Sequence, residues 1–211
     1  MKFLYENDEL CSLFTFNQTK GRGQYGNRWE SQAGNSLAYS TALNTSAVKK
    51  SQTLFNYHTA CTVRDFLAKL TASPVEIKWP NDLIIGGKKV AGILIEKVTV
   101  GGEGFYIIGT GINLRQSNFE GLPDAGSIFS QTGQIVDNEH FVQKYHDYLI
   151  AHLTQNSDES EILERFNRFL FRKGKISVFE KQRVRQNGII RNADADGFLW
   201  IELEQDGLQR F

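Results

Sequence analysis

The sequence is poor in cysteine, in long apolar runs and in excess charge, and each shortage excludes a class of protein. Its two cysteines, Cys11 and Cys61, lie in apolar patterns and form no CxxC pair, so we expect buried thiols in a reducing, cytoplasmic environment. No window reaches the roughly 18 apolar residues that span a bilayer, and the start of the chain does not resemble a signal peptide. We therefore expect no association with a membrane.

Charge of neither sign is in excess, because 24 Lys and Arg balance 24 Asp and Glu. This balance disfavours a surface built to hold DNA or RNA, so an RNA-binding module is the weaker alternative. We expect no metal site either. His140, His146 and His152 follow one another at intervals that point to different sides of a helix, and no HExxH motif occurs.

The remaining pattern predicts an α+β fold. Alternating apolar residues predict strands, and broad apolar stripes predict helices. The predicted strands cover residues 11–17, 37–43, 75–79, 83–85, 90–100 and 105–114. The predicted helices cover residues 52–70, 138–154 and 160–171, and Gly174 is the expected stop of the last one. Short β runs separated by Gly or Asp follow at residues 176–179, 183–185, 188–191 and 198–203, so we place a domain boundary near Lys173.

Four motifs contain the residue types that anion or nucleotide binding needs. The first is a loop, Gln18-Thr-Lys-Gly-Arg-Gly-Gln-Tyr-Gly-Asn-Arg-Trp29. Its glycines let backbone amides approach an anion, and Arg22 and Arg28 add positive charge suited to phosphate or carboxylate oxygens. The spacing is neither that of a Walker A loop nor that of GxGxxG at a helix start. A flexible surface loop with solvated arginines is the alternative.

The next two motifs belong to predicted strands. Lys78-Trp79-Pro80-Asn81-Asp82 ends a strand in a turn, so the Lys78 ammonium would project from the sheet; an ordinary hairpin turn is the alternative. The third motif, Lys88 to Glu96, reads K-K-V-A-G-I-L-I-E. Strict alternation puts Gly92 on the face opposite Lys89, where it forms a flat floor for a ligand or simply accommodates a neighbouring side chain.

The fourth motif is Gly109-Thr-Gly-Ile-Asn113. Two glycines weaken a strand unless something must come close, although a β-bulge explains them equally well. The Asn113 amide has both the donor and the acceptor that read an adenine edge. Each motif alone is ambiguous. In this order and spacing, from Gln18 to Asn113, they closely resemble the biotin protein ligase family.

The resemblance implies a class II synthetase-like mixed sheet flanked by helices in a catalytic domain of residues 1–173, followed by a small SH3-like β domain at 174–211. It implies a ligase that uses ATP and Mg²⁺ to activate biotin as biotinyl-5′-AMP. The biotin is then transferred to a lysine of a biotin carboxyl carrier protein, from acetyl-CoA carboxylase or another biotin-dependent carboxylase. A homodimer is also compatible with it. Relatives have an upstream Ser-Thr-Asn triplet and a further C-terminal strand, so both ends are expected to be shortened, without a DNA-binding domain.

The same resemblance assigns roles to individual residues. The catalytic residues, which would hold the reacting carboxylate and phosphate oxygens, are Lys78, Lys89 and Arg22. The residues expected to bind biotin and the adenylate are Gln18, Gly21, Arg22, Gly23, Gln24, Trp29, Lys89, Gly92 and Leu94. Those expected to bind ATP and its adenine are Asn113, Gly111, Asn81, Asp82 and Arg28. A lipoate or octanoate ligase of the same fold, and a degenerate non-catalytic biotin- or nucleotide-binding protein, are the alternatives.

Overall fold

A seven-stranded sheet is the largest element of the computed structural model, which describes residues 2–6 and 10–211. The strands lie in the order β1-β2-β5-β9-β8-β7-β6. Their bounds are β1 (Lys2–Glu6), β2 (Leu10–Thr15), β5 (Ser36–Asn44), β9 (Glu103–Asn113), β8 (Lys88–Val100), β7 (Asp82–Ile85) and β6 (Glu76–Lys78). The predicted α+β class is confirmed. The sheet was expected to be mixed, but each neighbouring pair of these strands is antiparallel, because short turns join most of them in sequence.

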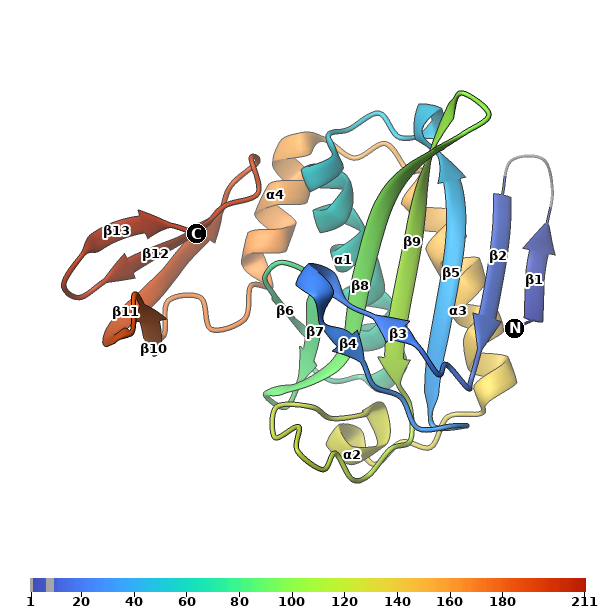
Figure 1. The fold of residues 1–211 in the computed structure, drawn as a ribbon, viewed down its shortest axis with the longest axis horizontal. Coiled ribbons are helices and arrows are strands. Elements are labelled where there is room, and N and C mark those ends of the chain that lie inside the picture. Colours follow the sequence, from blue (N-terminus) through green and yellow to red (C-terminus); the bar gives the residue numbers. More distant parts are fainter. Residues whose placement is uncertain (1, 7–9) are drawn as a thin grey trace.

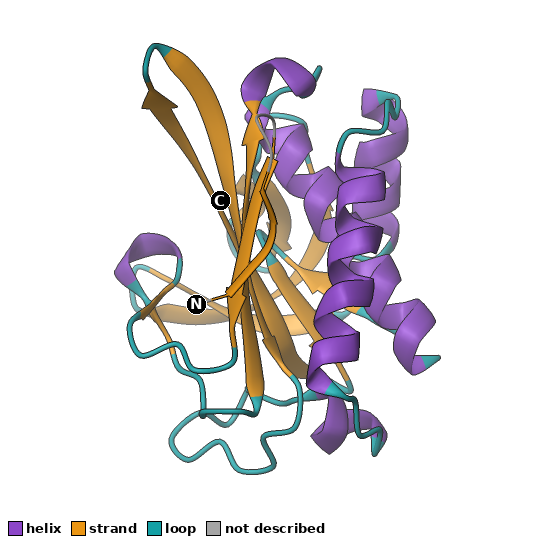
Figure 2. Ribbon diagram, turned by 90° about the vertical axis from the view of Figure 1, so that its right-hand side faces the viewer, coloured by secondary structure: helices purple, strands orange, loops and turns teal. Residues whose placement is uncertain are grey.

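Three helices cover one face of this sheet (Figures 1 and 2). They are α1 (Gln52–Thr71), α3 (Asn138–Leu153) and α4 (Glu159–Arg168). Two of the helix starts are fixed by side-chain caps: Ser51 Oγ accepts a hydrogen bond from Leu54 N at 3.2 Å, and Asp137 Oδ1 accepts one from His140 N at 2.8 Å. Within the described part of the chain, no helix is both long and apolar enough to cross a bilayer.

The end of α4 differs from the prediction. We expected the helix to continue to residue 171 and stop at Gly174, but it ends at Arg168. From there the chain runs beside the edge strand β6, where Ile77 N donates to Phe169 O at 2.8 Å and Phe171 N donates to Ile77 O at 2.8 Å. Tertiary pairing with the sheet therefore ends the helix before the glycine is reached.

The C-terminal residues form a separate four-stranded antiparallel sheet (Figure 1). Its strands are β10 (Ile176–Lys181), β11 (Val184–Ala193), β12 (Leu199–Leu203) and β13 (Gly207–Arg210). The strands predicted at residues 183–185 and 188–191 form one continuous strand, β11, because Gly188 does not interrupt it. A Cβ at Gly188 would lie 2.8 Å from Leu203 and 2.9 Å from Phe179, so the glycine permits close packing within the strand. The short polar strand β13 was not predicted.

The face of the large sheet opposite the helices is covered differently. A two-stranded ribbon, β3 (Gly21–Arg22) and β4 (Arg28–Trp29), lies over it with the short 3₁₀ turn Gln24–Gly26 (Figures 1 and 2). The short helix α2 (Ile128–Thr132) lies near one end of the sheet, and a 3₁₀ turn, Thr45–Ala47, follows β5. The glycine–arginine motif therefore folds back onto the central strands.

Candidate active site

Strand β9 buries one set of alternate residues against the helices and turns the other set toward the ribbon. Ile108 and Ile112 are both 0% exposed. Successive side chains of a strand point to opposite faces, so Gly109 and Gly111 lie on the ribbon side. Glycines there leave the backbone of the sheet uncovered by its own side chains.

Small residues of three adjacent strands continue this floor. The strand register sets two cross-strand rows, Ala38–Gly111–Gly92 and Ser40–Gly109–Leu94. Five of these six residues have a side chain no larger than that of serine. A ligand on this face can therefore approach the peptide groups of β5, β8 and β9 closely.

The indole of Trp29 occupies one of the two rows. A Cβ at Gly111 would lie 2.4 Å from Trp29 Cε2, and one at Gly92 would lie 3.2 Å from Trp29 Cζ3. A Cβ at Gly109 would meet only the Leu94 carbonyl oxygen, at 3.5 Å. Gly111 and Gly92 are thus needed by the indole, whereas the space above Gly109 is open. Trp29 Nε1 is buried without a hydrogen-bond partner among the described residues.

Lys89 lies on the same side as Gly92, contrary to the prediction. The register of β8 with β7 pairs Ile84 with Lys89 and Leu83 with Ala91, so β8 contains one extra residue at this point. A Cβ at Gly92 would lie 3.3 Å from Lys89 Cε. The expectation that Gly92 and Lys89 face opposite ways was wrong, because the bulge shifts the alternation by one residue and turns the lysine toward the floor.

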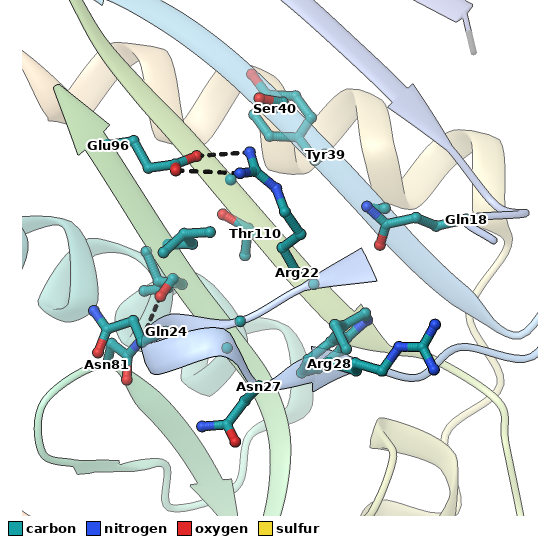
Figure 3. Close-up of a pocket in the computed structure, with 18 of the residues that line it drawn as sticks. Gln18, Arg22, Gln24, Asn27, Arg28, Tyr39, Ser40, Asn81, Glu96 and Thr110 are labelled. Carbon is teal, nitrogen blue, oxygen red and sulfur yellow. Dashed lines mark hydrogen bonds and ion pairs between the residues drawn. The ribbon is translucent and has the colours of Figure 1, made fainter. Parts of the chain in front are cut away.

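Two cations at the floor are each paired with a carboxylate. Lys89 Nζ lies 2.7 Å from Asp82 Oδ1, with side-chain exposures of 36% and 20%. Arg22 reaches from β3 across the sheet to Glu96 of β8, with 2.9 Å between Nη2 and Oε2 (Figure 3). Ion pairs this exposed contribute about 0–1 kcal/mol, so an incoming anion can share or exchange either partner.

Two adjoining cavities of small-molecule size open on this face. The first has a volume of about 440 Å³ and lies over the glycine floor. The second, of about 580 Å³, lies toward residues 119–125 and strand β10. Arg28, Trp29 and Lys89 line both. The predicted site residues that line the first cavity are Gln18, Arg22, Gly23, Gln24, Arg28, Trp29, Asn81, Asp82, Lys89, Gly92, Leu94 and Gly111.

Three predicted site residues lie outside the first cavity. Lys78 and Asn113 line the second one. The Asn113 side chain is 3% exposed, donates to Gly126 O at 2.9 Å and accepts from Ser36 Oγ at 3.3 Å. Gly21 lines neither cavity; a Cβ there would lie 2.4 Å from Trp29 O, so this glycine allows β3 to pair with β4.

Sequence reasoning did not assign a role to Ser40, Glu96 or Gly109, which also line the first cavity. Gly109 and Glu96 stand inside motifs that had been recognised, so their strand positions were a usable signal. Ser40 has no such signal, because only the register of β5 with β9 brings it beside Gly109.

Tyr39 connects the cavity wall with the helix layer. Its hydroxyl oxygen lies 3.1 Å from Ser12 Oγ and 2.8 Å from His146 Nδ1 of α3. Burial raises the pKa of Tyr39 to about 12, and burial also lowers the pKa of His146 below its usual range. Both groups are therefore neutral at pH 7, and they are part of the support of the site rather than acids or bases in it.

Comparison with known proteins identifies the family of this chain. The sequence pattern that defines the biotin/lipoate A/B protein ligase family matches residues 5–113. The chain belongs to this family. The chain is 34% identical to a biotin–[acetyl-CoA-carboxylase] ligase of Paracoccus denitrificans, over 59% of this chain and 55% of that protein. It is 31% identical to the bifunctional ligase/repressor BirA of Salmonella typhimurium over 90% of this chain and 61% of that protein.

A solved structure extends the match to nearly the whole chain. The biotin protein ligase from Aquifex aeolicus, in complex with biotin and ATP, superposes with a TM-score of 0.77 at 25% identity, covering 95% of this chain and 84% of that one. The matched curated relatives are longer proteins. The chain spans 45% to 61% of the length of the two relatives named above and of the BirA proteins of two Bacillus species.

Proposed function

We propose that this protein activates biotin with ATP to biotinyl-5′-AMP and transfers the biotin to a lysine of a biotin carboxyl carrier protein. The observation that supports this best is the pair of adjoining cavities that share Lys89, Arg28 and Trp29. One cavity would hold the acid and the other the nucleotide, so that the two reactants meet at the shared lysine. The match to a structure with biotin and ATP bound adds to this argument.

Charge neutralisation is the main task of such a site. A carboxylate and a phosphate chain repel one another, by roughly 4 kcal/mol for each pair of unit charges about 4 Å apart at an effective dielectric constant near 20. Lys89 and Arg22 would offset this repulsion once they exchange Asp82 and Glu96 for the substrate anions. They would also stabilise the charge that builds on the α-phosphate as the carboxylate attacks and pyrophosphate leaves.

Binding roles follow from the two cavities. We propose that Gln18, Gly23, Gln24, Gly92 and Leu94 bind biotin over the floor. Lys78 would contact the phosphates from the second cavity, where Asn113 also lies. Because the Asn113 amide already bonds to Ser36 and Gly126, an adenine contact would use only its remaining donor and lone pair.

Mg²⁺ fits this site only as a companion of the nucleotide. Within residues 2–6 and 10–211, no three His, Cys, Asp or Glu side chains converge on a metal position. Mg²⁺ commonly uses one or two carboxylates and completes its shell with phosphate oxygens and water. Asp82, which pairs with Lys89 where the two cavities meet, would supply one such ligand.

The second step needs a free amine at the same place. The carrier lysine, once deprotonated, would attack the carbonyl carbon of the mixed anhydride, form the amide and release AMP. We further propose that residues 1–173 form the catalytic unit and residues 174–211 a small β domain beside it. A homodimer stays a prediction.

Pyrophosphate exchange tests the proposal. We expect the protein to incorporate labelled pyrophosphate into ATP when biotin is present and not when lipoate or octanoate replaces it. Exchange stimulated by lipoate would favour the related ligase activity of the same family. Tight biotin binding without exchange would favour a non-catalytic binding protein.

A further inference from the structure

Residues 172–191, which comprise the segment just before β10 and most of the β10–β11 hairpin, concentrate positive charge. Residues 172–191 contain seven Lys or Arg and a single acidic residue, Glu180, although the whole chain is balanced. The remainder of the chain therefore has six more acidic than basic residues. Such an uneven distribution attracts a partner with the opposite sign of charge.

The charges of this hairpin are available to a partner. Two of its cations are paired within the small sheet, since Lys181 Nζ lies 3.4 Å from Asp206 Oδ2 and Arg191 pairs with Glu202. The exposed cations for which the described residues provide no ion pair are Arg172, Lys173, Lys175, Arg183 and Arg185. Glu180 is the acidic residue of this segment and lies opposite Arg185 in the strand register.

Aliphatic side chains are exposed between these cations. Ile176 is 73% exposed, Val178 61% and Val184 50%, and β10 is an edge strand of its sheet. Exposed apolar groups of this size on a strand edge mark a contact surface. Single-stranded nucleic acids are bound by cations beside aromatic side chains on which bases stack, and the exposed side chains between these cations are aliphatic.

The hairpin also borders the proposed active site. Ser177, Val178 and Phe179 of β10 line the second cavity together with Lys78 and Lys89. A protein that inserts a lysine side chain into this cavity must therefore rest against β10. Because the hairpin borders this cavity, the acceptor protein is the partner that its position favours.

We propose that the β10–β11 hairpin is the docking surface for the acceptor protein, which meets it with an acidic face that contains aliphatic side chains. This proposal rests on the proposed function. The cations steer the acceptor toward the cavity, and Ile176 and Val178, on one face of β10, provide the apolar contact once it has arrived.

Charge reversal separates docking from chemistry. The test variant is Lys175→Glu, Arg183→Glu, Arg185→Glu, none of which lines either cavity. With a purified biotin carboxyl carrier domain as the acceptor, we expect its KM to rise on the order of tenfold or more, while biotin-dependent pyrophosphate exchange is unchanged. The KM of the wild-type protein should rise with ionic strength, and that of the variant should respond much less.

A matched control reverses three exposed lysines elsewhere, Lys49→Glu, Lys69→Glu and Lys144→Glu, and should leave the acceptor KM unchanged. A carrier domain whose surface Asp and Glu are replaced by Lys should recover activity with the hairpin variant. An unchanged acceptor KM in the hairpin variant would overturn the proposal. The proposal would also be overturned if the hairpin variant lost binding to duplex DNA or RNA that the wild-type protein shows, while its KM for the acceptor stayed unchanged. Absence of exchange in the wild-type protein would instead overturn the proposed function itself.

Discussion

The two faces of the central strands differ in what their side chains do. On the helix side, β8 and β9 present Ile93, Ile95, Ile108 and Ile112, all at most 9% exposed. On the ribbon side, the same strands present glycines beside Leu94 and Glu96, below a ribbon that carries Arg22 and Trp29. Neighbouring residues of one strand therefore line the buried core and the first cavity in turn.

This difference indicates that the helix side of the strands contributes most to the stability of the sheet. Burial of a large aliphatic side chain contributes about 1.5–3 kcal/mol, and a glycine contributes no such burial and adds conformational entropy to the unfolded chain. The helix face must therefore stabilise a sheet whose other face has mainly small side chains at the floor of the first cavity. Substitutions on the two faces should have separable effects, and the following predictions test that separation.

Lys89→Ala should have the largest effect on activity. We expect adenylate formation to fall about 10³-fold, because the charge that stabilises the transition state is lost. The free energy of unfolding should change by no more than about 0.5–1 kcal/mol, since the ion pair with Asp82 is partly exposed. Pyrophosphate exchange and urea unfolding measure the two quantities. Wild-type exchange in this variant would contradict the assignment, and Lys69→Ala serves as the exposed control.

Ile108→Ala should do the reverse. The side chain is 0% exposed, so the cavity left behind should lower the free energy of unfolding by about 3 kcal/mol. Urea denaturation followed by tryptophan fluorescence measures this change. The fraction that remains folded should bind biotin with nearly unchanged Kd. A large loss of affinity without a loss of stability would show that the two faces are not separable.

Gly109→Val should weaken biotin binding by on the order of tenfold without unfolding the protein. Its Cβ has room, but the added methyl groups would fill the space above the floor. Gly111→Val is the matched contrast, because its Cβ would overlap the Trp29 indole and destabilise the protein by about 1–3 kcal/mol. Calorimetric titration with biotin and thermal unfolding distinguish them. Equal behaviour of the two variants would refute the proposed division of the floor.

Acidification should produce the smallest effect. Burial lowers the pKa of His146, so below the ordinary histidine pKa the unfolded chain takes up a proton that the folded protein does not. Stability should therefore decrease as pH falls from 7 toward 5. His146→Gln should make this dependence shallower, and His140→Gln on the exposed side of α3 should not. Equal slopes in all three proteins would exclude a contribution from His146.

Local pattern predicted most elements, and the reasons for the failures are particular. The strands that became β5, β8 and β9 and the helix α1 were predicted within a few residues, because alternation and apolar stripes are local signals. The end of α4 and the continuity of β11 were not predicted correctly. Both depend on partners distant in sequence: β6 for the first, and the close packing of Gly188 against Leu203 for the second.

The candidate site shows the same limit. Twelve of the predicted site residues line the first cavity, since their motifs are contiguous in sequence. Lys89 lines both cavities, but it was assigned to the wrong face of its strand, because alternation cannot anticipate a bulge that pairing with β7 imposes. Lys78 was grouped with Arg22, yet the two line different cavities.

The sequence by itself determined the residue types of this protein: glycines at the floor, cations in the loop and the strands, and aliphatic residues at alternate positions behind them. Only the tertiary structure decided which of these groups meet. Register set the rows of the floor, a bulge turned Lys89 toward it, and folding of the ribbon brought Arg22 to Glu96. The reason is that residue chemistry and local periodicity are properties of short segments, whereas pairing and ion-pair geometry depend on segments as far apart as residues 22 and 96.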